Sequence, residues 1–279
     1  MQNLIRLVED LKKKPGTTDQ QVFNLIREYL QVLILKALYQ SRYGKGLSFI
    51  GGTCLRICYN LKRFSEHLDF TLDRKIPNYS FQELNEIIAR YLKGTDFEVD
   101  LNIKSEKVVQ KSFIRIHNIL HFFALSQRQE QKIHVKLEVD IKPIVVSDHD
   151  IETYFVTKLD ELFPILKHRN ETLFAGKILA ILNRTYTKGR DYYDLIWYLN
   201  KKIDIDLNYL NRGLKQAGLE LQFHNKNEVI EHLQKQIARV STDTILKDIG
   251  SFLEDASEER WVRDYSSVFK QSAKDFLEK

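Results

Sequence analysis

The segment from His134 to Ile141 most strongly limits what this chain can fold into, because polar and aliphatic side chains alternate along its whole length. Successive side chains of a β-strand point to opposite faces, so the aliphatic residues would share one face and the polar residues the other. The polar face then carries His134, Lys136, Glu138 and Asp140. We therefore expect a strand that is half buried in a sheet and presents acidic groups on its open side.

Alternation of this kind is confined to residues 96–145, and the sequence on either side has apolar residues at the three- and four-residue spacing of helices. Before this window, the expected elements are helices at 20–43, 54–60 and 81–92 and short strands at 47–50 and 66–72. After about residue 150, only helices are expected, at 171–184, 191–199, 207–218, 226–240 and, in more than one piece, 243–277. The predicted fold class is therefore α+β, with a mixed sheet, flanking helices and an all-helical C-terminal domain.

Composition narrows the class of protein further. The chain has 279 residues, of which 43% are hydrophobic and 29% charged, and this balance is that of a folded globular protein. No apolar run approaches the ~18 residues of a membrane span, and residues 1–14 lack a signal-peptide core, so we expect a cytoplasmic protein. Cys54 and Cys58 lie one helical turn apart, which favours two small buried side chains over a metal site. The net charge of +5 permits a polyanionic partner without requiring one.

Gly51, Gly52 and Thr53 lie between the first short strand and the helix that follows it. Glycines allow a backbone to approach phosphate oxygens closely, and a helix N-terminus offers N–H groups and a favourable dipole. Thr53 could add a hydroxyl to such a site. Taken alone, however, the same three residues also fit a tight turn with a capping threonine.

His67 and Asp69 fall on the polar face of the strand expected at 66–72. A carboxylate there, beside a phosphate-binding turn, would suit a Mg²⁺ ion. Glu138 or Asp140 could complete the set of acids that two-metal phosphoryl transfer requires. The alternative is an ordinary solvated strand face on which the acids form ion pairs with neighbouring lysines.

Charged side chains recur between residues 177 and 194, along two expected helices and the glycine turn between them. They are Lys177, Arg184, Arg190, Asp191 and Asp194. These side chains would suit a triphosphate, because a lysine ammonium is a compact positive charge and an arginine guanidinium can donate two parallel hydrogen bonds to phosphate oxygens. The two aspartates are three residues apart and so share one side of a helix. Each of these features also occurs in helices that bind no ligand.

In combination, these segments resemble the AbiEii/AbiGii-type nucleotidyltransferase toxin family, a branch of the polymerase-β-like superfamily. Residues 49–59 (FIGGTCLRICY) and 63–70 (RFSEHLDF) are similar to the family's Gly-Gly-Thr-x-Leu and Arg-x-Ser-x-Asp-x-Asp-Phe motifs. Residues 177–184 (KILAILNR) and 190–195 (RDYYDL) resemble its Lys-x-x-Ala-x-x-x-Arg and Arg-Asp-x-x-Asp-Leu motifs. Order and spacing match over about residues 47–199, more than half of the chain.

The resemblance implies an enzyme that moves a nucleotide from an NTP to an acceptor, either an RNA such as tRNA or a protein, with Mg²⁺ or Mn²⁺ as cofactor. It also implies a toxin of a bacterial toxin–antitoxin or phage-defence system, restrained by a separate antitoxin protein. The chain would then comprise N-terminal helices at 1–45, a nucleotidyltransferase-like α/β core at 46–150, and a helical domain at 151–279 that completes the active-site cleft.

The motifs and the alternating strand together assign roles to individual residues. The catalytic residues would be Asp69, Asp140, Lys177 and Asp194, with Asp191 as the alternative late acid. The NTP-binding residues would be Gly51, Gly52, Thr53, Lys177, Arg184 and Arg190. The metal ligands would be Asp69, His67, Glu138 and Asp140.

One position departs from the family motif, because His67 stands where the first aspartate of the Asp-x-Asp pair is expected. A neutral imidazole suits Mn²⁺ or Zn²⁺ better than Mg²⁺, and the change removes one negative charge. Three outcomes are open: an altered metal preference, replacement of the lost charge by Glu138 or Asp140, or loss of catalysis. Glu66 is not expected to substitute, because its side chain should point to the opposite face of the strand.

Two other functions stay open at this point. The chain could be a catalytically impaired relative that binds nucleotide or RNA and acts through a protein partner. It could also be a helical interaction module on an α/β scaffold, with no nucleotide at all. The basic residues of the C-terminal helices, whose default interpretation is a solvated surface, are Lys215, Lys226, Lys235, Arg239 and Lys247.

Overall fold

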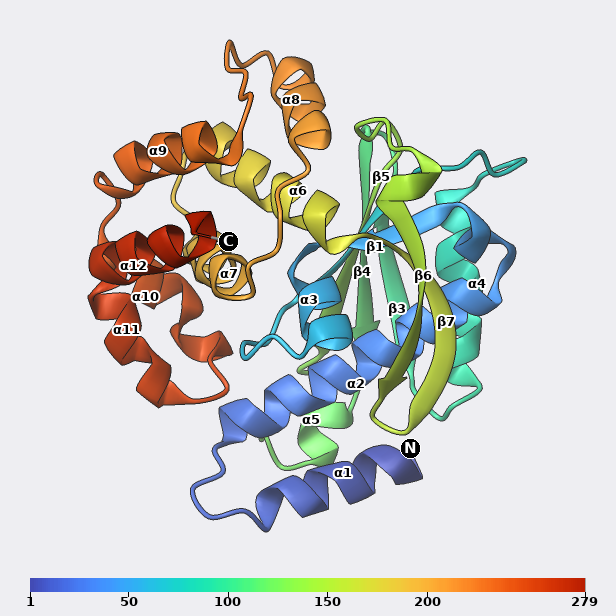
Figure 1. Cartoon of the computed structure of the whole chain (residues 1–279). Helices are drawn as coiled ribbons and strands as arrows, with labels where there is room; N and C mark the ends of the chain where they lie inside the picture. The colour runs from blue at the N-terminus through green and yellow to red at the C-terminus, as the bar shows by residue number, and fades with distance from the viewer. Residues whose placement is uncertain (279) are drawn as a thin grey trace. The chain divides into compact units, whose positions relative to one another are not determined.

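The structure is a computed structural model that describes residues 1–278 (Figure 1). The first part of the chain comprises the elements α1 (Gln2–Lys12), α2 (Asp19–Gln40), η1 (Arg42–Lys45), β1 (Leu47–Ile50), α3 (Gly51–Tyr59), β2 (His67–Leu72), α4 (Phe81–Lys93), β3 (Val99–Lys104), β4 (Val109–Ile116), α5 (Ile119–Phe122) and β5 (Ile133–Asp140). The rest comprises η2 (Asp148–Asp150), β6 (Ile151–Lys158), β7 (Glu161–His168), α6 (Asn170–Asn183), α7 (Gly189–Asn200), α8 (Leu207–Gln216), α9 (Lys226–Ile237), α10 (Thr242–Ile249), η3 (Gly250–Phe252), η4 (Ala256–Glu258), α11 (Glu259–Arg263) and α12 (Tyr265–Leu277).

A seven-stranded mixed sheet has the strand order β3-β4-β5-β2-β1-β7-β6. β2 pairs with β1 in antiparallel and with β5 in parallel orientation, whereas β4 is antiparallel to both of its neighbours, β3 and β5. β1 in turn runs parallel to β7. The strand that carries His67 and Asp69 therefore lies in the centre of the sheet, directly beside the strand that carries Glu138.

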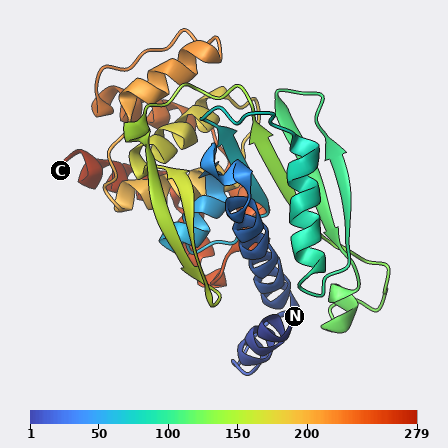
Figure 2. The ribbon, with the colours of Figure 1, turned by 90° about the vertical axis from the view of Figure 1, so that its right-hand side faces the viewer.

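Helices α2 and α4 pack against each other and against strands of this sheet. α2 begins with a capping box, in which the Thr18 hydroxyl accepts from the Gln21 N–H and the Gln21 side chain accepts from the Thr18 N–H. α4 packs against β3 and β4 (Figure 2), and its Asn85 accepts a hydrogen bond from the buried Ser112 hydroxyl of β4 at 2.6 Å. Ser112 therefore lies on the face of β4 that packs against α4.

The sequence predictions of an α+β class and a mixed sheet are confirmed, as are the long helices, within a few residues at their ends. The helix after β1 begins earlier than expected, at Gly51 rather than at Cys54, so both glycines of the turn belong to its first turn. Cys54 and Cys58 are buried thiols on that helix, as expected. Burial alternates along β5 as the sequence predicts, with the aliphatic residues buried.

The expectation of helices alone after residue 150 is wrong, because β6 and β7 form a hairpin at one edge of the sheet. Its two-residue turn consists of Leu159 and Asp160, which have φ angles of +54° and +64°. Two successive left-handed residues are typical of a type I′ turn, whose twist matches that of the flanking strands. The usual sequence signal for this turn, Asn-Gly or Asp-Gly, is missing from Leu159-Asp160.

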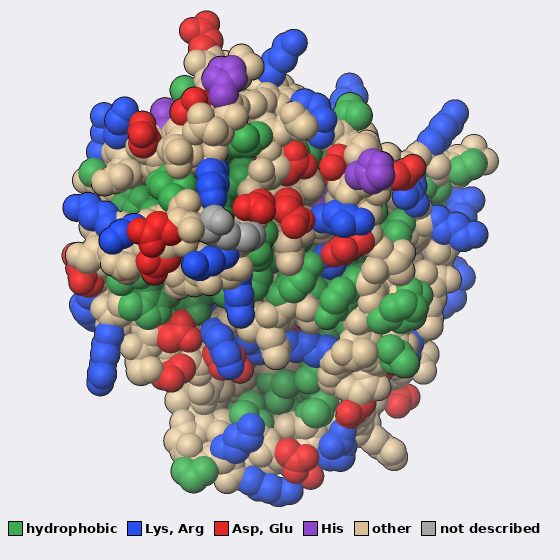
Figure 3. Space-filling model, in the orientation of Figure 1, with side chains coloured by type: hydrophobic (Ala, Val, Ile, Leu, Met, Phe, Trp, Pro, Cys, Tyr) green, Lys and Arg blue, Asp and Glu red, His purple; other side chains and the backbone are tan. Residues whose placement is uncertain are grey.

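The chain divides into two compact units. The first contains residues 1–60, 64–143 and 153–167, and the second contains residues 61–63 and 144–152 and the chain from His168 onward. Within the second unit, α7 packs against α6, α10 and α12. Lys and Arg side chains on the visible face are interspersed with Asp and Glu rather than gathered into one patch (Figure 3). Among the described residues, no helix combines the length and apolarity needed to cross a membrane.

Candidate active site

The turn between β1 and α3 is shaped around a carboxylate. Gly51 has a φ of +80°, a conformation that costs an L-residue roughly 1–2 kcal/mol. A Cβ built on Gly51 would lie 2.6 Å from Asp69 Oδ2, well inside van der Waals contact. Glycine is therefore required at this position both by the backbone and by the close approach of Asp69.

Thr53 links the same turn to β2 by a hydrogen bond. Its side chain is fully buried, and its hydroxyl donates a hydrogen bond to the backbone carbonyl of His67. Gly51 and Gly52, in contrast, are half buried at the start of α3. NTP binding by this turn stays a prediction, and it would rely on the backbone N–H groups of the helix N-terminus rather than on the Thr53 hydroxyl.

His67, Asp69 and Glu138 lie together on neighbouring strands, and we call these three residues the strand cluster. The register of β2 and β5 places Asp69 directly beside Glu138, with His67 one pair earlier. One ligand atom from each residue lies within 4.8 Å of the other two, and all three side chains are half buried. One nitrogen and two carboxylate donors at this spacing fit a single divalent cation.

Asp140 lies on the same face of β5 but outside the strand cluster. It is beside Thr71 in the register, and its Oδ1 accepts a hydrogen bond from the Lys142 N–H at 2.9 Å. Of the four predicted metal ligands, the described structure thus brings three together and leaves Asp140 next to them along the strand. Its predicted roles as ligand and as catalytic residue stay predictions.

Three basic side chains surround Glu138. Lys111 Nζ and Lys136 Nζ each lie 3.0 Å from one of its carboxylate oxygens, and His67 Nδ1 lies 3.4 Å away. Burial alone would raise the pKa of Glu138, but hydrogen bonds from the histidine and the two lysines hold it well below its usual range. Glu138 is therefore a fixed anion, which suits the binding of a cation better than the acceptance of a proton.

Glu66 lies close to His67, contrary to expectation. It precedes the first residue of β2, so the alternation of the strand does not fix the direction of its side chain. Its carboxylate is 3.9 Å from His67 Nε2 and 3.9 Å from an Arg27 guanidinium nitrogen. The prediction that Glu66 points away is wrong, and the imidazole has a carboxylate near each of its two nitrogens.

The charged residues between 177 and 194 meet in the second unit, where we call Lys177, Asp191, Asp194, Arg63 and Arg184 the buried ion network. Lys177 Nζ lies 2.7 Å from Asp191 Oδ1 and 2.8 Å from Asp194 Oδ2. Arg63 donates to both oxygens of Asp194, at 2.7 and 2.6 Å. Arg184 Nε lies 3.0 Å from Asp191 Oδ2. Asp194 thus accepts a bidentate pair of hydrogen bonds from Arg63 and forms an ion pair with Lys177.

The charged side chains of the buried ion network are shielded from solvent. The side chains of Asp194, Arg63 and Asp191 are 0%, 2% and 3% exposed. Burial alone would lower the pKa of Lys177, but Asp191 and Asp194 raise it. Burial alone would likewise raise the pKa of Asp191, which Lys177 and Arg184 lower. The geometry is that of a structural ion network, and the predicted contacts of its members with substrate stay predictions.

Arg190 and Gly189 have structural contacts of their own. The Arg190 guanidinium lies over the Phe252 ring, 4.5 Å from its centroid, and its Nε is 3.5 Å from Asp248 Oδ2. A Cβ on Gly189 would lie 2.4 Å from the Ile245 carbonyl oxygen, so the glycine lets α7 approach α10 closely. Gly189 therefore serves helix packing, and the predicted contact of Arg190 with an NTP stays a prediction.

Sequence reasoning gave no role to Arg63 or Lys111. Arg63 opens the second motif, and its burial against Asp194 requires a partner 131 residues away in sequence. Lys111 lies on β4 and reaches Glu138 across the strand pair, where the register places the two residues side by side. The pairing of Lys136 with an acid of its own strand, in contrast, was expected and is observed.

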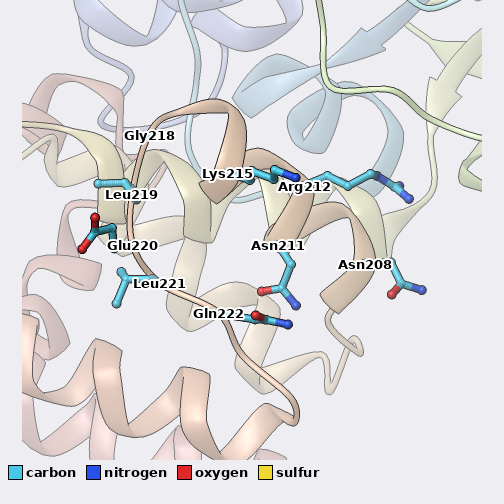
Figure 4. A pocket seen from close by; sticks show the side chains of 9 residues that line it. All are labelled: Asn208, Asn211, Arg212, Lys215, Gly218, Leu219, Glu220, Leu221 and Gln222. Atoms are coloured by element: carbon cyan, nitrogen blue, oxygen red, sulfur yellow. The ribbon is translucent and has the colours of Figure 1, made fainter.

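A separate recess of about 860 Å³ lies at α8 and the loop that follows it in the second unit (Figure 4). Its lining consists of Asn208, Asn211, Arg212, Lys215, Gly218, Leu219, Glu220, Leu221 and Gln222. Asn211 anchors the loop, because its amide donates to the Phe223 carbonyl and accepts from the Phe223 N–H. Arg212 Nη2 lies 3.7 Å from Asp150. The recess contains no predicted site residue.

Comparison with known proteins relates the chain to one family. The profile described as "Nucleotidyl transferase AbiEii toxin, Type IV TA system" matches residues 33–278. The chain belongs to this family. Membership of the AbiEii family confirms the expected nucleotidyltransferase enzyme class and the expected toxin–antitoxin setting. No curated protein matches the sequence.

Solved structures that share the fold of this AbiEii family member include the following three. JHP933 from Helicobacter pylori has 17% identity and a TM-score of 0.54, covering 90% of this chain and 93% of that one. A putative nucleotidyltransferase from H. pylori has 17% identity and a TM-score of 0.53, covering 90% and 96%. MenT4, a nucleotidyltransferase toxin from Mycobacterium tuberculosis H37Rv, has 18% identity and a TM-score of 0.57, covering 95% and 89%.

His67 distinguishes this AbiEii member from the motif that its family resemblance predicts. The donor set of one imidazole nitrogen and two carboxylates fits a cation that accepts nitrogen ligands, such as Mn²⁺, better than Mg²⁺. Lys111 and Lys136 add two positive charges beside Glu138. The strand cluster is therefore less negative than a site with three acids would be.

Proposed function

We propose that this AbiEii family member is an active, metal-dependent nucleotidyltransferase that moves a nucleotide from an NTP to a hydroxyl of an RNA acceptor such as a tRNA. One observation carries this proposal: the glycine turn and the strand cluster meet at a single point. Asp69 Oδ2 approaches Gly51 so closely that a Cβ there would lie 2.6 Å from it. A phosphate gripped by the helix N-terminus would thus lie beside the metal-binding carboxylates.

In the proposed reaction, the acceptor hydroxyl oxygen attacks the α-phosphorus of the NTP. A new O–P bond forms, the bond from the α-phosphorus to the bridging oxygen breaks, and pyrophosphate leaves. A divalent cation held by His67, Asp69 and Glu138 would supply positive charge to the phosphate oxygens. The proton of the hydroxyl passes to a base, for which Asp140 is the better candidate because the basic neighbours of Glu138 hold its pKa low.

The protein's own lysines support the same chemistry. Lys111 and Lys136 lie beside the strand cluster and offer ammonium groups to phosphate oxygens. Because His67 replaces an acid, the site would take a single metal ion that accepts a nitrogen ligand together with the triphosphate. We accordingly propose that Mn²⁺ supports activity better than Mg²⁺.

The family supports a toxin role, and we propose that a separate antitoxin restrains this protein in the cytoplasm, with phage defence as one setting. The alternative function is a catalytically impaired relative that binds nucleotide or RNA and acts through a protein partner. His67 favours this alternative, because it replaces an acid in the set of metal donors.

The test is to incubate the purified chain with deproteinised RNA and each α-labelled NTP, with Mg²⁺ and with Mn²⁺ in parallel. Asp69→Asn removes the negative charge of one proposed metal ligand without changing side-chain size. Asp96→Asn is the matched control, because Asp96 is an exposed carboxylate of the same unit, and asparagine tolerates its φ of +68°.

We expect label on RNA with the wild type and with Asp96→Asn, stronger with Mn²⁺, and none with Asp69→Asn. Label on a protein rather than on RNA would identify a protein as the acceptor. If no labelled product forms with either metal, the enzyme proposal is wrong and the impaired binder takes its place. The His67→Asp variant would then be tested in the same assay. If this variant transfers nucleotide, the histidine is the cause of the lost activity.

A further inference from the structure

One face of β4 points away from α4. Ser112 is fully buried and donates its hydroxyl to Asn85 of α4. Its neighbours Lys111 and Phe113 must therefore project from the opposite face of the strand, and so must Arg115. The same holds for the polar residues of β5, whose aliphatic residues are the buried ones.

The register joins these side chains into one surface, because Phe113 pairs with Lys136 and Arg115 pairs with His134. We call this surface the open face, and it consists of Lys111, Phe113, Arg115, His134 and Lys136. It is accessible to solvent, since Lys111 is 41% and Arg115 34% exposed and His134 is exposed as well. Phe113 is only half buried, although it lies in the middle of a strand.

The open face carries three cations, Lys111, Arg115 and Lys136, and its acidic neighbours are Asp100 and Glu138. Asp100 is contacted by three basic groups, with Lys132 at 2.6 Å, His117 at 2.7 Å and Arg115 at 3.6 Å, and Glu138 is contacted by Lys111 and Lys136. Together with Lys132, the three cations outnumber these two carboxylates. Partial burial and the Arg115 cation lower the pKa of His134, as expected at a position of positive potential. This face therefore attracts anions.

The open face is continuous with the strand cluster. Lys136 pairs with His67 in the β2–β5 register, and Lys111 pairs with Glu138 in the β4–β5 register. Both lysines lie 3.0 Å from the Glu138 carboxylate. A chain-like anion lying along the open face would therefore end at the strand cluster.

We propose that the open face binds the single-stranded end of the acceptor RNA, with a base stacked on Phe113 and phosphates held by Lys111, Arg115 and Lys136. This inference rests on the proposed nucleotidyl transfer and assigns the acceptor a place next to the strand cluster. Lys136 Nζ lies 6.0 Å from the centroid of the Phe113 ring, so a cation already lies close to the stacking surface.

Shape and chemistry favour a single strand over a duplex or a second triphosphate. A flat aromatic side chain among cations binds bases that are free to unstack, and a duplex hides those base faces. Lys111 and Arg115 are four residues apart on β4, so their Cα atoms are separated by about 13 Å. That length suits several linked nucleotides better than one triphosphate.

The test measures binding of a fluorescent single-stranded RNA oligonucleotide, and of the matching duplex, to the full chain by fluorescence anisotropy over a range of salt. Phe113→Leu removes the ring, Phe113→Tyr keeps it, and Arg115→Met removes one charge. Phe155→Leu and Lys93→Met are the matched controls. Phe155 is 61% exposed on the edge strand β6, and Lys93 is exposed at the end of α4, which packs on the other face.

We expect Phe113→Leu to weaken single-stranded RNA binding by roughly tenfold or more, while Phe113→Tyr and both controls bind like the wild type. Arg115→Met should reduce the slope of log affinity against log salt by about 0.7. Calorimetric binding of an NTP with Mn²⁺ should be the same in all variants. Thermal denaturation verifies that each variant is folded.

The proposal is overturned if the wild type binds duplex RNA as tightly as single-stranded RNA, or if the open-face variants bind like the controls. Its failure is distinct from that of the proposed function. Transfer to RNA with unchanged affinity in Phe113→Leu would refute the open face and leave the enzyme proposal standing. RNA binding that depends on Phe113, without transfer under either metal, would refute the enzyme proposal and support the surface.

Discussion

Replacing Gly51 by alanine tests whether the glycine turn and Asp69 form one site. Two costs are expected, and Gly16 allows them to be separated. Both glycines have a positive φ, +80° at Gly51 and +77° at Gly16, but a Cβ on Gly16 would meet nothing within 4 Å. Gly16→Ala therefore carries only the backbone cost of about 1–2 kcal/mol, reduced by the lower entropy of the unfolded alanine chain.

Gly51→Ala carries the same backbone cost and an overlap with Asp69. Its Cβ would lie 2.6 Å from Asp69 Oδ2 and 3.2 Å from Asp69 Cβ, so the carboxylate must move. Overpacking of this kind costs about 1–3 kcal/mol, and we expect Gly51→Ala to be destabilised by that much more than Gly16→Ala. Moving Asp69 also displaces it from Glu138, so Gly51→Ala should lose nucleotide transfer while Gly16→Ala keeps it.

The assay is equilibrium urea unfolding of both single variants and of the pair Gly51→Ala with Asp69→Ala, alongside the labelled-NTP reaction. Truncating Asp69 removes Oδ2 and leaves only the 3.2 Å contact with its Cβ, so the excess cost of Gly51→Ala should largely vanish in that background. The reasoning is refuted if Gly51→Ala is no less stable than Gly16→Ala, or if its excess cost survives without the carboxylate.

Three further predictions concern the charged residues. Arg63→Met leaves Asp194 buried beside a single lysine and should lower the free energy of unfolding by about 3–5 kcal/mol in chemical denaturation, and a loss below about 1 kcal/mol would contradict the buried ion network. His67→Asp should raise activity with Mg²⁺ relative to Mn²⁺, and an unchanged ratio would remove the histidine from the metal site. Because the folded-state pKa of Glu138 is lowered, its stabilising contribution is present above the unfolded value of about 4.3 and is lost as pH falls below it. Glu138→Gln should therefore lose less stability than the wild type between neutral and acidic pH in thermal denaturation, and equal slopes would argue against the basic contacts of Glu138.

The central strands were predictable because their signal is local. In β5, each residue faces either the core or the open side, so side-chain polarity alone predicts the direction of Glu138. The turn after β1 was predictable for the same reason, since two glycines before a helix limit the backbone there. The sequence could not indicate that Asp69 fills the space of a missing Cβ, because that contact joins the start of α3 to β2.

The buried ion network was only half predictable. Helical spacing correctly indicated that Asp191 and Asp194 share a side, and both contact Lys177. Helical spacing could not predict the contact of Arg63 with Asp194, because the two residues are 131 positions apart in sequence. The β6–β7 hairpin was missed because Leu159 and Asp160 adopt left-handed conformations without the glycine or asparagine that usually reveals such a turn.

The division of the chain into units has a consequence for the order in which the protein folds during synthesis. The second unit draws on residues 61–63 and 144–152 as well as on the chain from His168, and the first unit needs residues 153–167. A nascent chain that ends near residue 150 would lack β7, the partner of β1, and the acidic partner of Arg63. At that length neither unit is complete, because its long-range contacts wait for later residues. The strand cluster thus waits for residues up to 167 to complete its unit, although Glu138, the last residue of the cluster, is made well before them.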